Sequence, residues 1–209
     1  MKQVTEQLQT LARLLEYPTG RGDIPVAPVH NDVGDRNVAA PSYDRFACAF
    51  SALSQDEREE LYTATFDVTP ACVPYVSIHL FGEENFKRGE FMAALNARYV
   101  AAGFDTRGEL PDHIAVLLRF LAETDEVERR ELVEFCLLGP LAKMITALTG
   151  ENPYRGLLEA AHEVLRTAYP ELKPAASPLE QMQTHGSCNA VAAGCGGCSP
   201  AAALEHSIP

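Results

Sequence analysis

Apolar residues recur every three or four positions along most of this chain, and this spacing restricts it to helices. Two of the clearest stripes are Val4, Leu8, Leu11 and Leu15 near the start and Ile114, Leu117, Leu118 and Leu121 in the middle. Such spacing places apolar side chains on one face of an α-helix. The nearest approach to a strand is VPYVSIHLF at 73–81, and its proline and its helical neighbours argue against one.

The stripes predict an all-α fold, a single-domain helical bundle over residues 1–170. The chain has 209 residues, enough for one sizeable domain. Capping signals mark several helix starts: Ser54 with Glu57 forms a capping box, Asp125 precedes Glu128 by three positions, and Asn152 precedes a proline.

Other residues indicate where helices turn or stop. A helix from Ser42 is expected to point Ala49 inward, and Cys48 is expected to be a small core residue. A helix over residues 83–103 should end at Gly103, and Pro111 should begin the next one. A helix that reaches Gly139-Pro140 should kink or split there.

Two stretches lack a helical stripe. Residues 18–40 contain several glycines and prolines and predict a long mobile loop, which would permit a domain-swapped dimer as well as a monomer. Residues 171–209 are rich in Ala, Pro, Ser and Gly and predict a disordered tail.

The charge balance excludes several classes of partner. There are 29 acidic and 17 basic side chains, a formal net charge of −12, which argues against nucleic acid and anionic membrane as partners. No apolar run is long enough to span a membrane, and the N-terminus lacks the apolar core of a signal peptide. We therefore expect a cytoplasmic location.

The adjacent pair Asp112 and His113 invites a catalytic interpretation, with the histidine as a base. Neighbouring residues on a helix point about 100° apart, so these two side chains would not pair easily. No nucleophile motif, phosphate-binding loop or second acid accompanies them. We expect that the chain is not an enzyme.

Four stretches carry a resemblance to a known family. HLFGEENFKRGEFMAAL at 79–95 and, further on, GELPDHIAVLLRFLA at 108–122 resemble the nitrate reductase assembly chaperones of the NarJ (delta subunit) type. LARLLEYP at 11–18 and YTATFDVTP at 62–70 are similar to the same family. The resemblance covers roughly residues 5–170 and extends to the wider TorD/DmsD group of redox-enzyme maturation chaperones.

The resemblance implies an all-helical chaperone without catalytic activity or a required cofactor. It implies binding of the N-terminal leader of a molybdenum-containing catalytic subunit, most simply that of a nitrate reductase, and help with molybdenum cofactor insertion before membrane docking. Any membrane association would be peripheral, through that subunit.

A receptor for such a leader needs an apolar groove and carboxylates for Arg or Lys. The residues that match the family's motifs, or that would supply these groups, are Tyr75, His79, Phe81, Glu109, Leu110, Pro111, Asp112 and His113. Each also has a structural interpretation. Asp112 would complement a helix dipole behind Pro111, and His79, Tyr75 and Phe81 would be core residues.

The tail offers an alternative function. His185, Cys188, Cys195 and Cys198 are four potential metal ligands, and the last two form a C-x-x-C pair. Zinc, an iron–sulfur centre or dithiol chemistry would fit these side chains. The alternative is a metal-binding or redox protein in which the helical domain is a scaffold.

Overall fold

A computed structural model describes residues 2–19 and 40–181 and shows helices joined by short connections, with no strand among those residues. The predicted all-α fold is confirmed. In chain order the helices are α1 (Lys2–Leu14), α2 (Ala40–Ser51), α3 (Gln55–Phe66), α4 (Val76–Phe81), α5 (Lys87–Ala102), α6 (Ile114–Glu123), α7 (Glu126–Leu132), the π-helical turn η1 (Val133–Leu137), α8 (Leu138–Ala147) and α9 (Pro153–Ala168). None of these helices is long and apolar enough to cross a membrane.

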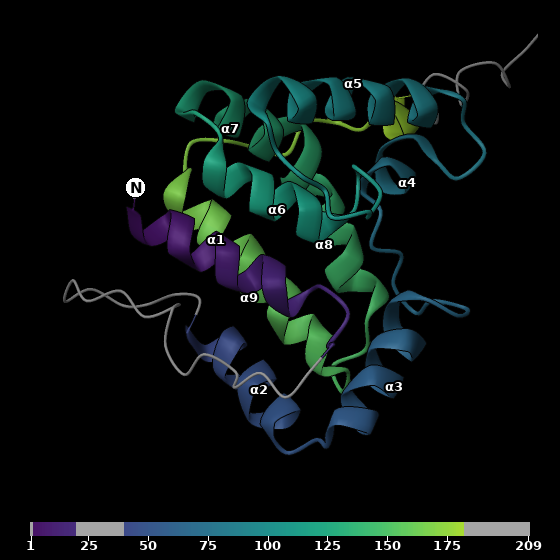
Figure 1. Ribbon diagram of the computed structural model, residues 1–209, viewed down its shortest axis with the longest axis vertical. Helices are drawn as coiled ribbons and strands as arrows, with labels where there is room; N and C mark the ends of the chain where they lie inside the picture. Colours follow the sequence, from purple (N-terminus) through teal and green to yellow (C-terminus); the bar gives the residue numbers. More distant parts are fainter. Residues whose placement is uncertain (1, 20–39, 182–209) are drawn as a thin grey trace, which may run out of the picture.

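Helix α6 lies at the centre of the bundle. All nine of its residues from Ile114 to Ala122 are buried, including Arg119. Helix α1 packs along α6 and also contacts α9, which in turn supports α2 and α8 (Figure 1). The apolar stripes predicted in α1 and α6 therefore face each other in the core.

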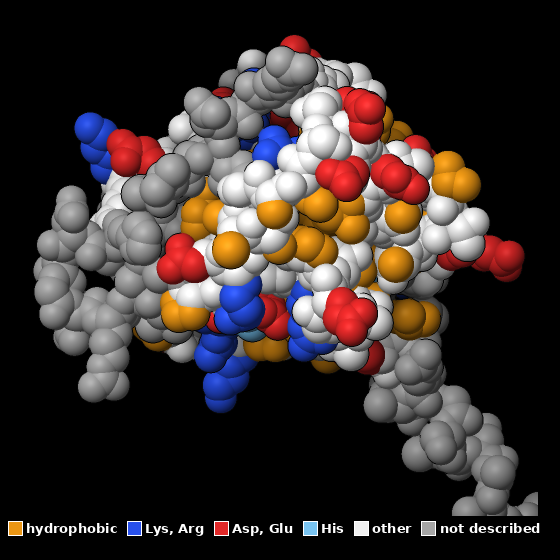
Figure 2. Space-filling model, turned by 90° about the horizontal axis from the view of Figure 1, so that it is seen from below, with side chains coloured by type: hydrophobic (Ala, Val, Ile, Leu, Met, Phe, Trp, Pro, Cys, Tyr) orange, Lys and Arg blue, Asp and Glu red, His pale blue; other side chains and the backbone are white. Residues whose placement is uncertain are grey.

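Charged side chains surround the apolar ones on the surface. Seen from the end that α2 and α3 form, apolar side chains gather across the middle of the face, with acidic side chains above and beside them (Figure 2). Acidic residues exceed basic ones by 12 in the sequence. On this face the apolar side chains thus lie between acidic side chains above and a group of Lys and Arg side chains below (Figure 2).

Several helix termini follow the capping signals in the sequence. Ser54 and Glu57 form the predicted capping box at α3, and Asp125 accepts the backbone N–H of Glu128 at α7. Asn152 caps α9, and Gly103 ends α5 with a left-handed φ of 66°. Each cap satisfies backbone groups that a helix end leaves without partners.

Three local predictions were wrong. Helix α5 begins at Lys87 because Asn85 accepts the Lys87 N–H and keeps the preceding residues in a turn. Helix α6 begins at Ile114, not at Pro111, because the backbone around His113 pairs with another segment. On α2, Ala49 and Cys48 are exposed, whereas Tyr43 occupies the buried position.

The interruption expected at Gly139-Pro140 takes the form of the π-helical turn. Pro140 has no N–H to donate to the carbonyl four residues earlier. The preceding turn widens, and the Leu138 N–H reaches the Val133 carbonyl, five residues back. The chain therefore continues into α8 without a break.

The first part of the predicted tail is packed on the bundle. Leu172 and Ser177 are buried, and the Ala175 N–H donates to the Glu134 carbonyl over 3.1 Å. Lys143 on α8 pairs with Glu180 and donates to the Ser177 hydroxyl. The prediction of disorder from residue 171 is wrong as far as residue 181, because short polar contacts hold a segment that has no helical stripe.

One glycine allows α2 and α9 to approach each other closely. A Cβ at Gly156 would lie 2.7 Å from the Ser42 carbonyl oxygen and 3.4 Å from the Phe46 nitrogen, both backbone atoms. The approach lets Phe46 and Phe50 pack against Tyr154 with ring centroids 5.8 and 5.7 Å apart. Backbone atoms cannot move aside as a side-chain end can, so the position requires glycine.

We expect Gly156→Ala to lower the free energy of unfolding by about 1–3 kcal/mol, because the added methyl group separates the two helices. The matched control is Gly89→Ala in α5, where a Cβ meets nothing within 4 Å. That variant should gain roughly 0.5–1 kcal/mol from the better helix propensity of alanine. Urea denaturation of both variants measures the difference, and equal stabilities would contradict the close-approach argument.

Candidate functional site

Two loops that lie far apart in the sequence are joined by backbone hydrogen bonds. The Val76 N–H donates to the Asp112 carbonyl and the Ile114 N–H donates to the Pro74 carbonyl, each over 2.9 Å. Tyr75 and His113 thus form an isolated antiparallel bridge. Their rings meet edge to face with centroids 5.5 Å apart. We call this arrangement the 75–113 bridge, and it fixes the starts of α4 and α6 relative to each other.

Asp112 holds this bridge from the inside. It is fully buried, and its Oδ2 accepts a hydrogen bond from the Ser77 hydroxyl, near the N-terminal end of α4. The Ser77 oxygen in turn accepts the Arg88 Nε–H over 3.0 Å. The predicted position of Asp112 inside the helix that follows Pro111 was wrong. Its carboxylate instead faces the first turn of α4, where the helix dipole favours negative charge.

His113 caps α6. Its Nδ1 accepts the Ala115 N–H over 3.2 Å, so Nδ1 must be unprotonated for the cap to form. Burial lowers the pKa of His113, against the opposing effects of Glu109 and Asp112, and favours the neutral ring. A neutral ring at this position adds no positive charge to the adjoining surface.

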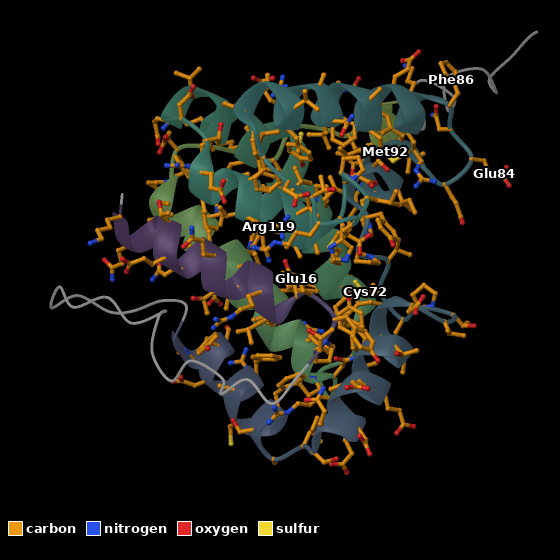
Figure 3. The ribbon with its side chains drawn as sticks, viewed as in Figure 1. Glu16, Cys72, Glu84, Phe86, Met92 and Arg119 are labelled. Atoms are coloured by element: carbon orange, nitrogen blue, oxygen red, sulfur yellow. The ribbon has the colours of Figure 1, made fainter. Side chains whose placement is uncertain are left out.

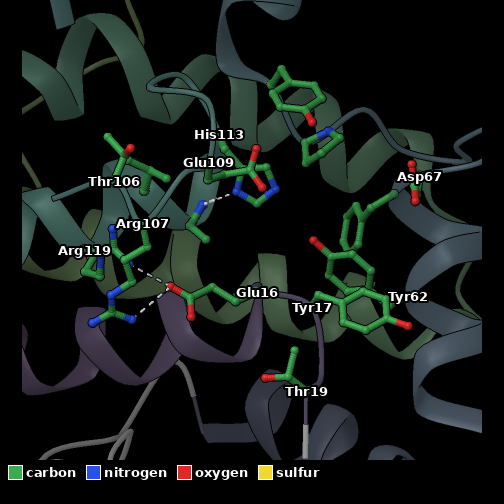
Figure 4. A pocket seen from close by; sticks show the side chains of 15 residues that line it. Glu16, Tyr17, Thr19, Tyr62, Asp67, Thr106, Arg107, Glu109, His113 and Arg119 are labelled. Carbon is green, nitrogen blue, oxygen red and sulfur yellow. Dashed lines mark hydrogen bonds and ion pairs between the residues drawn. The ribbon is translucent and has the colours of Figure 1, made fainter. Parts of the chain in front are cut away.

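A pocket of about 400 Å³ opens beside the 75–113 bridge (Figure 4). Its walls come from the end of α1, α3, the loop before α4, the loop before α6, and α6 itself. The lining residues are Glu16, Tyr17, Thr19, Tyr62, Phe66, Asp67, Pro74, Tyr75, Thr106, Arg107, Glu109, His113, Ala115, Val116 and Arg119. We call it the Tyr75 pocket. Its volume suits one or two large side chains of a bound chain.

The lining of the Tyr75 pocket combines aromatic rings with carboxylates. Three tyrosines, Tyr17, Tyr62 and Tyr75, supply aromatic surface, and the Tyr17 and Tyr62 rings meet edge to face at 5.3 Å. Asp67 and Glu109 add carboxylates, and neither has an ion pair within the part of the chain that the structure describes. Aromatic faces beside unpaired carboxylates suit a cationic side chain, above all a guanidinium.

The pocket also contains two cations that are already paired. Glu16 Oε1 lies 3.1 Å from Arg119 Nη1 and 3.6 Å from Arg107 Nη1. Glu16 lies just beyond the end of α1 and Arg119 lies on the neighbouring α6 (Figure 3). Arg119 is buried, donates to the Asp105 carbonyl, and has its guanidinium 5.0 Å from the Phe104 ring centroid. This pair therefore closes one side of the pocket.

The structure brings together only some of the residues that the sequence singled out. Tyr75, Glu109 and His113 line the pocket, and Asp112 supports it from behind. Leu110 is 46% exposed outside the lining, and the Pro111 carbonyl accepts the Tyr99 hydroxyl. Tyr75, Glu109 and His113 thus face the pocket, Asp112 and Pro111 support its wall, and Leu110 does neither.

His79 and Phe81 lie on α4, away from the pocket lining. His79 Nε2 is 2.8 Å from the Val73 carbonyl, which ties α4 to the loop that carries Tyr75. Burial lowers the pKa of His79 and favours the neutral ring, and in that ring Nε2 carries the proton that it donates to the Val73 carbonyl. Phe81 packs against Phe91 at 5.6 Å. Both residues support the fold around the pocket.

Sequence reasoning missed Glu16, Tyr17, Asp67, Arg107 and Arg119 as pocket residues. A signal was present for three of them: Glu16 and Tyr17 lie in LARLLEYP, and Asp67 lies in YTATFDVTP. Both stretches carried the resemblance, but no residue in them was assigned a role. Nothing in the local sequence marks Arg107 or Arg119, because their pairing with Glu16 is long-range.

The proposed metal ligands His185, Cys188, Cys195 and Cys198 lie outside the described residues. Within residues 2–19 and 40–181, no group of three or more His, Cys, Asp or Glu side chains is placed to hold a metal ion. Burial raises the pKa of both Cys72 and Cys136 to about 12, which keeps these core thiols protonated. The metal hypothesis therefore rests on the tail sequence.

Comparison with known proteins gives one match. Residues 34–151, more than half of the chain, match the family model described as nitrate reductase delta subunit. The matched range includes α2 to α8, and with them the 75–113 bridge and most of the pocket wall. A search of curated proteins finds no match.

We expect the stability of the protein to fall as the pH drops below about 6.5, the ordinary histidine pKa, because the folded state disfavours a charged His113. The unfolded chain then binds more protons than the folded chain, so acid favours unfolding. His113→Asn keeps a side-chain cap and removes the titration. Thermal melts between about pH 5 and pH 8 should show a flatter pH dependence for this variant, and an unchanged slope would contradict the assignment.

The metal hypothesis predicts bound zinc or iron in the purified chain. Protein grown with both metals should contain close to one equivalent of metal centre, lost in a Cys195→Ser/Cys198→Ser variant, because thiolates are the favoured ligands. Elemental analysis with a Cys48→Ser control, which alters an exposed thiol on α2, measures this. Only trace metal in the unaltered protein would rule out the site.

Proposed function

This chain belongs to the nitrate reductase delta subunit family, and we propose that it is a chaperone for a molybdenum-containing nitrate reductase. In this proposal it binds the N-terminal leader of the catalytic subunit in the cytoplasm, while that subunit still lacks its cofactor. It assists molybdenum cofactor insertion and leaves before the enzyme docks at the membrane. The chaperone itself performs no catalysis and requires no cofactor.

The observation that carries the proposal is the Tyr75 pocket. Leaders of the kind that the resemblance implies combine basic residues with an apolar helical stretch. In the pocket, Asp67 and Glu109 lie beside tyrosine rings, and Pro74 and Val116 add apolar surface. A guanidinium stacked on tyrosine and paired with a carboxylate gains from both contacts.

Rigidity of the pocket supports the same role. The 75–113 bridge, the buried Asp112 and the His113 cap together fix the two loops that form the pocket wall. A wall that is already in place costs a ligand less ordering on binding than a wall that must first form. The site is therefore suited to capture a flexible leader from a subunit that has not finished folding.

The negative net charge of the chain also supports binding of a basic leader. The formal net charge of −12 attracts a basic peptide over distance and accelerates encounter at low salt. Glu109 is a useful carboxylate for a test, because it is exposed and the one hydrogen bond that its side chain accepts among the described residues comes from the N–H of the next residue, Leu110. Asp112 is unsuitable, since its removal would disturb the fold.

We expect Glu109→Gln to weaken binding of a synthetic leader peptide about three- to ten-fold, with a smaller dependence on salt, because one cation–carboxylate contact is lost. Calorimetric titration measures both quantities. The matched control is Glu84→Gln, an exposed carboxylate at the far edge of the molecule (Figure 3), which should bind as the unaltered protein does.

Two results would contradict the proposal. If the unaltered protein binds no leader of any molybdoenzyme catalytic subunit from the same genome, the chaperone role fails. If it binds but Glu109→Gln and Glu84→Gln have the same affinity, the leader binds elsewhere. Circular dichroism of each variant confirms that its helices are intact.

A further inference from the structure

A second hollow lies next to the Tyr75 pocket and shares three residues with it. This hollow has a volume of about 370 Å³, and Glu6, Gln9, Thr10, Arg13 and Glu123 line it together with the shared residues. The shared residues are Glu16, Arg107 and Arg119. Their side chains therefore form the partition between two spaces that would otherwise be continuous along α1.

The two arginines in this partition are held very differently. Arg119 Nη1 is 3.1 Å from Glu16 Oε1, its Nη2 is 2.6 Å from the Asp105 carbonyl, and only 9% of its side chain is exposed. The Arg107 side chain is 65% exposed and lies 3.6 Å from the same Glu16 oxygen. Among the described residues, this is the one ion pair that Arg107 makes. Arg119 is therefore a fixed part of the wall, whereas the exposed Arg107 side chain has room to turn away from Glu16 into solvent.

The backbone at Arg107 has an unusual conformation beside the partition. Its φ is 60°, in the left-handed region that a residue other than glycine rarely occupies. Asp105 Oδ1 accepts the Arg107 N–H over 2.8 Å, and Gly108 follows with a φ of 82°. This conformation, uncommon for an arginine, accompanies an exposed guanidinium that lies at the carboxylate between the two hollows.

We propose that Arg107 is a built-in substitute for the cation of the bound peptide, and this inference rests on the proposed function. In the free protein the Arg107 guanidinium pairs with the Glu16 carboxylate. When a leader binds, an Arg or Lys side chain of the peptide pairs with Glu16 in place of Arg107, and Arg107 turns to solvent. The peptide then extends past the Glu16–Arg119 pair from the Tyr75 pocket into the second hollow.

The exchange gives selectivity at little energetic cost. One cation replaces another beside the Glu16–Arg119 pair, so the balance of charge at Glu16 is the same before and after the peptide binds. A peptide that has only apolar residues cannot displace Arg107 and is confined to the Tyr75 pocket. A peptide that has a cation followed by a polar segment gains the second hollow as well, where Glu6 and Glu123 lie.

The variant Arg107→Asn tests this inference, because asparagine tolerates a left-handed backbone and has no charge. Calorimetric titration with the synthetic leader peptide should give a dissociation constant about two- to five-fold lower than that of the unaltered protein, since an exposed competing ion pair is removed. Arg107→Lys keeps a competing cation and should bind within about two-fold of the unaltered protein.

A remote arginine provides the matched control. Arg98 on α5 pairs with Glu128 and Glu131, away from both hollows, so Arg98→Gln should leave affinity unchanged. In an Arg107→Asn/Glu16→Gln double variant the gain from Arg107→Asn should disappear, because the carboxylate that both cations use is gone. Thermal melts check that the double variant is folded.

The outcomes distinguish failure of the role proposed for Arg107 from failure of the proposed chaperone function. If the unaltered protein binds the leader and Arg107→Asn binds it equally or more weakly, the role of Arg107 is overturned and the chaperone function stands. If the unaltered protein binds no leader, the proposed function fails. Tighter binding by Arg107→Asn that persists in the double variant would also overturn the role assigned to Glu16.

Discussion

Two backbone hydrogen bonds between residues 74–76 and residues 112–114 are the constraint on which the rest of the site depends. They join loops from distant parts of the sequence and set the positions at which α4 and α6 begin. Asp112, Ser77 and Arg88 secure this bridge from the protein interior, and His113 caps the helix that leaves it. Without these contacts Tyr75 and Glu109 would lie on independent loops, and the Tyr75 pocket would have no fixed wall.

The helical core beneath the bridge gives the pocket a rigid base. Helix α6 is buried along its length and carries Arg119 into the pocket on a rigid element. Glu16 arrives from the end of α1, which packs along α6. Arg119 thus comes from a core helix, and Glu16 and Tyr17 come from the residues that directly follow α1. Arg107 and Glu109 come from the loop before α6, and Tyr75 comes from the loop before α4, two loops that the 75–113 bridge joins.

The sequence predicted the local parts of this structure better than the long-range ones. Ser54, Asp125 and Asn152 act as caps because capping depends on residues within one helical turn. The start of α6 was misplaced because pairing with Pro74 decides it, and the pairing partner lies about 40 positions away. The segment at 171–181 was mistaken for disordered chain for the same reason, since its contacts with Lys143 and Glu134 leave no periodic pattern. Of the site, the sequence indicated Glu109 and His113 through a resemblance and Tyr75 through the need for an apolar groove wall. The partition of Glu16, Arg107 and Arg119 exists only in three dimensions.

The most direct test of the account is a crystal structure of the protein bound to a synthetic leader peptide of the nitrate reductase catalytic subunit. The account predicts a basic side chain of the peptide between Tyr75 and the Glu109 carboxylate, a second peptide contact at Glu16, and Arg107 turned into solvent. A peptide seated on another face, with the Tyr75 pocket empty and Arg107 still on Glu16, would contradict it.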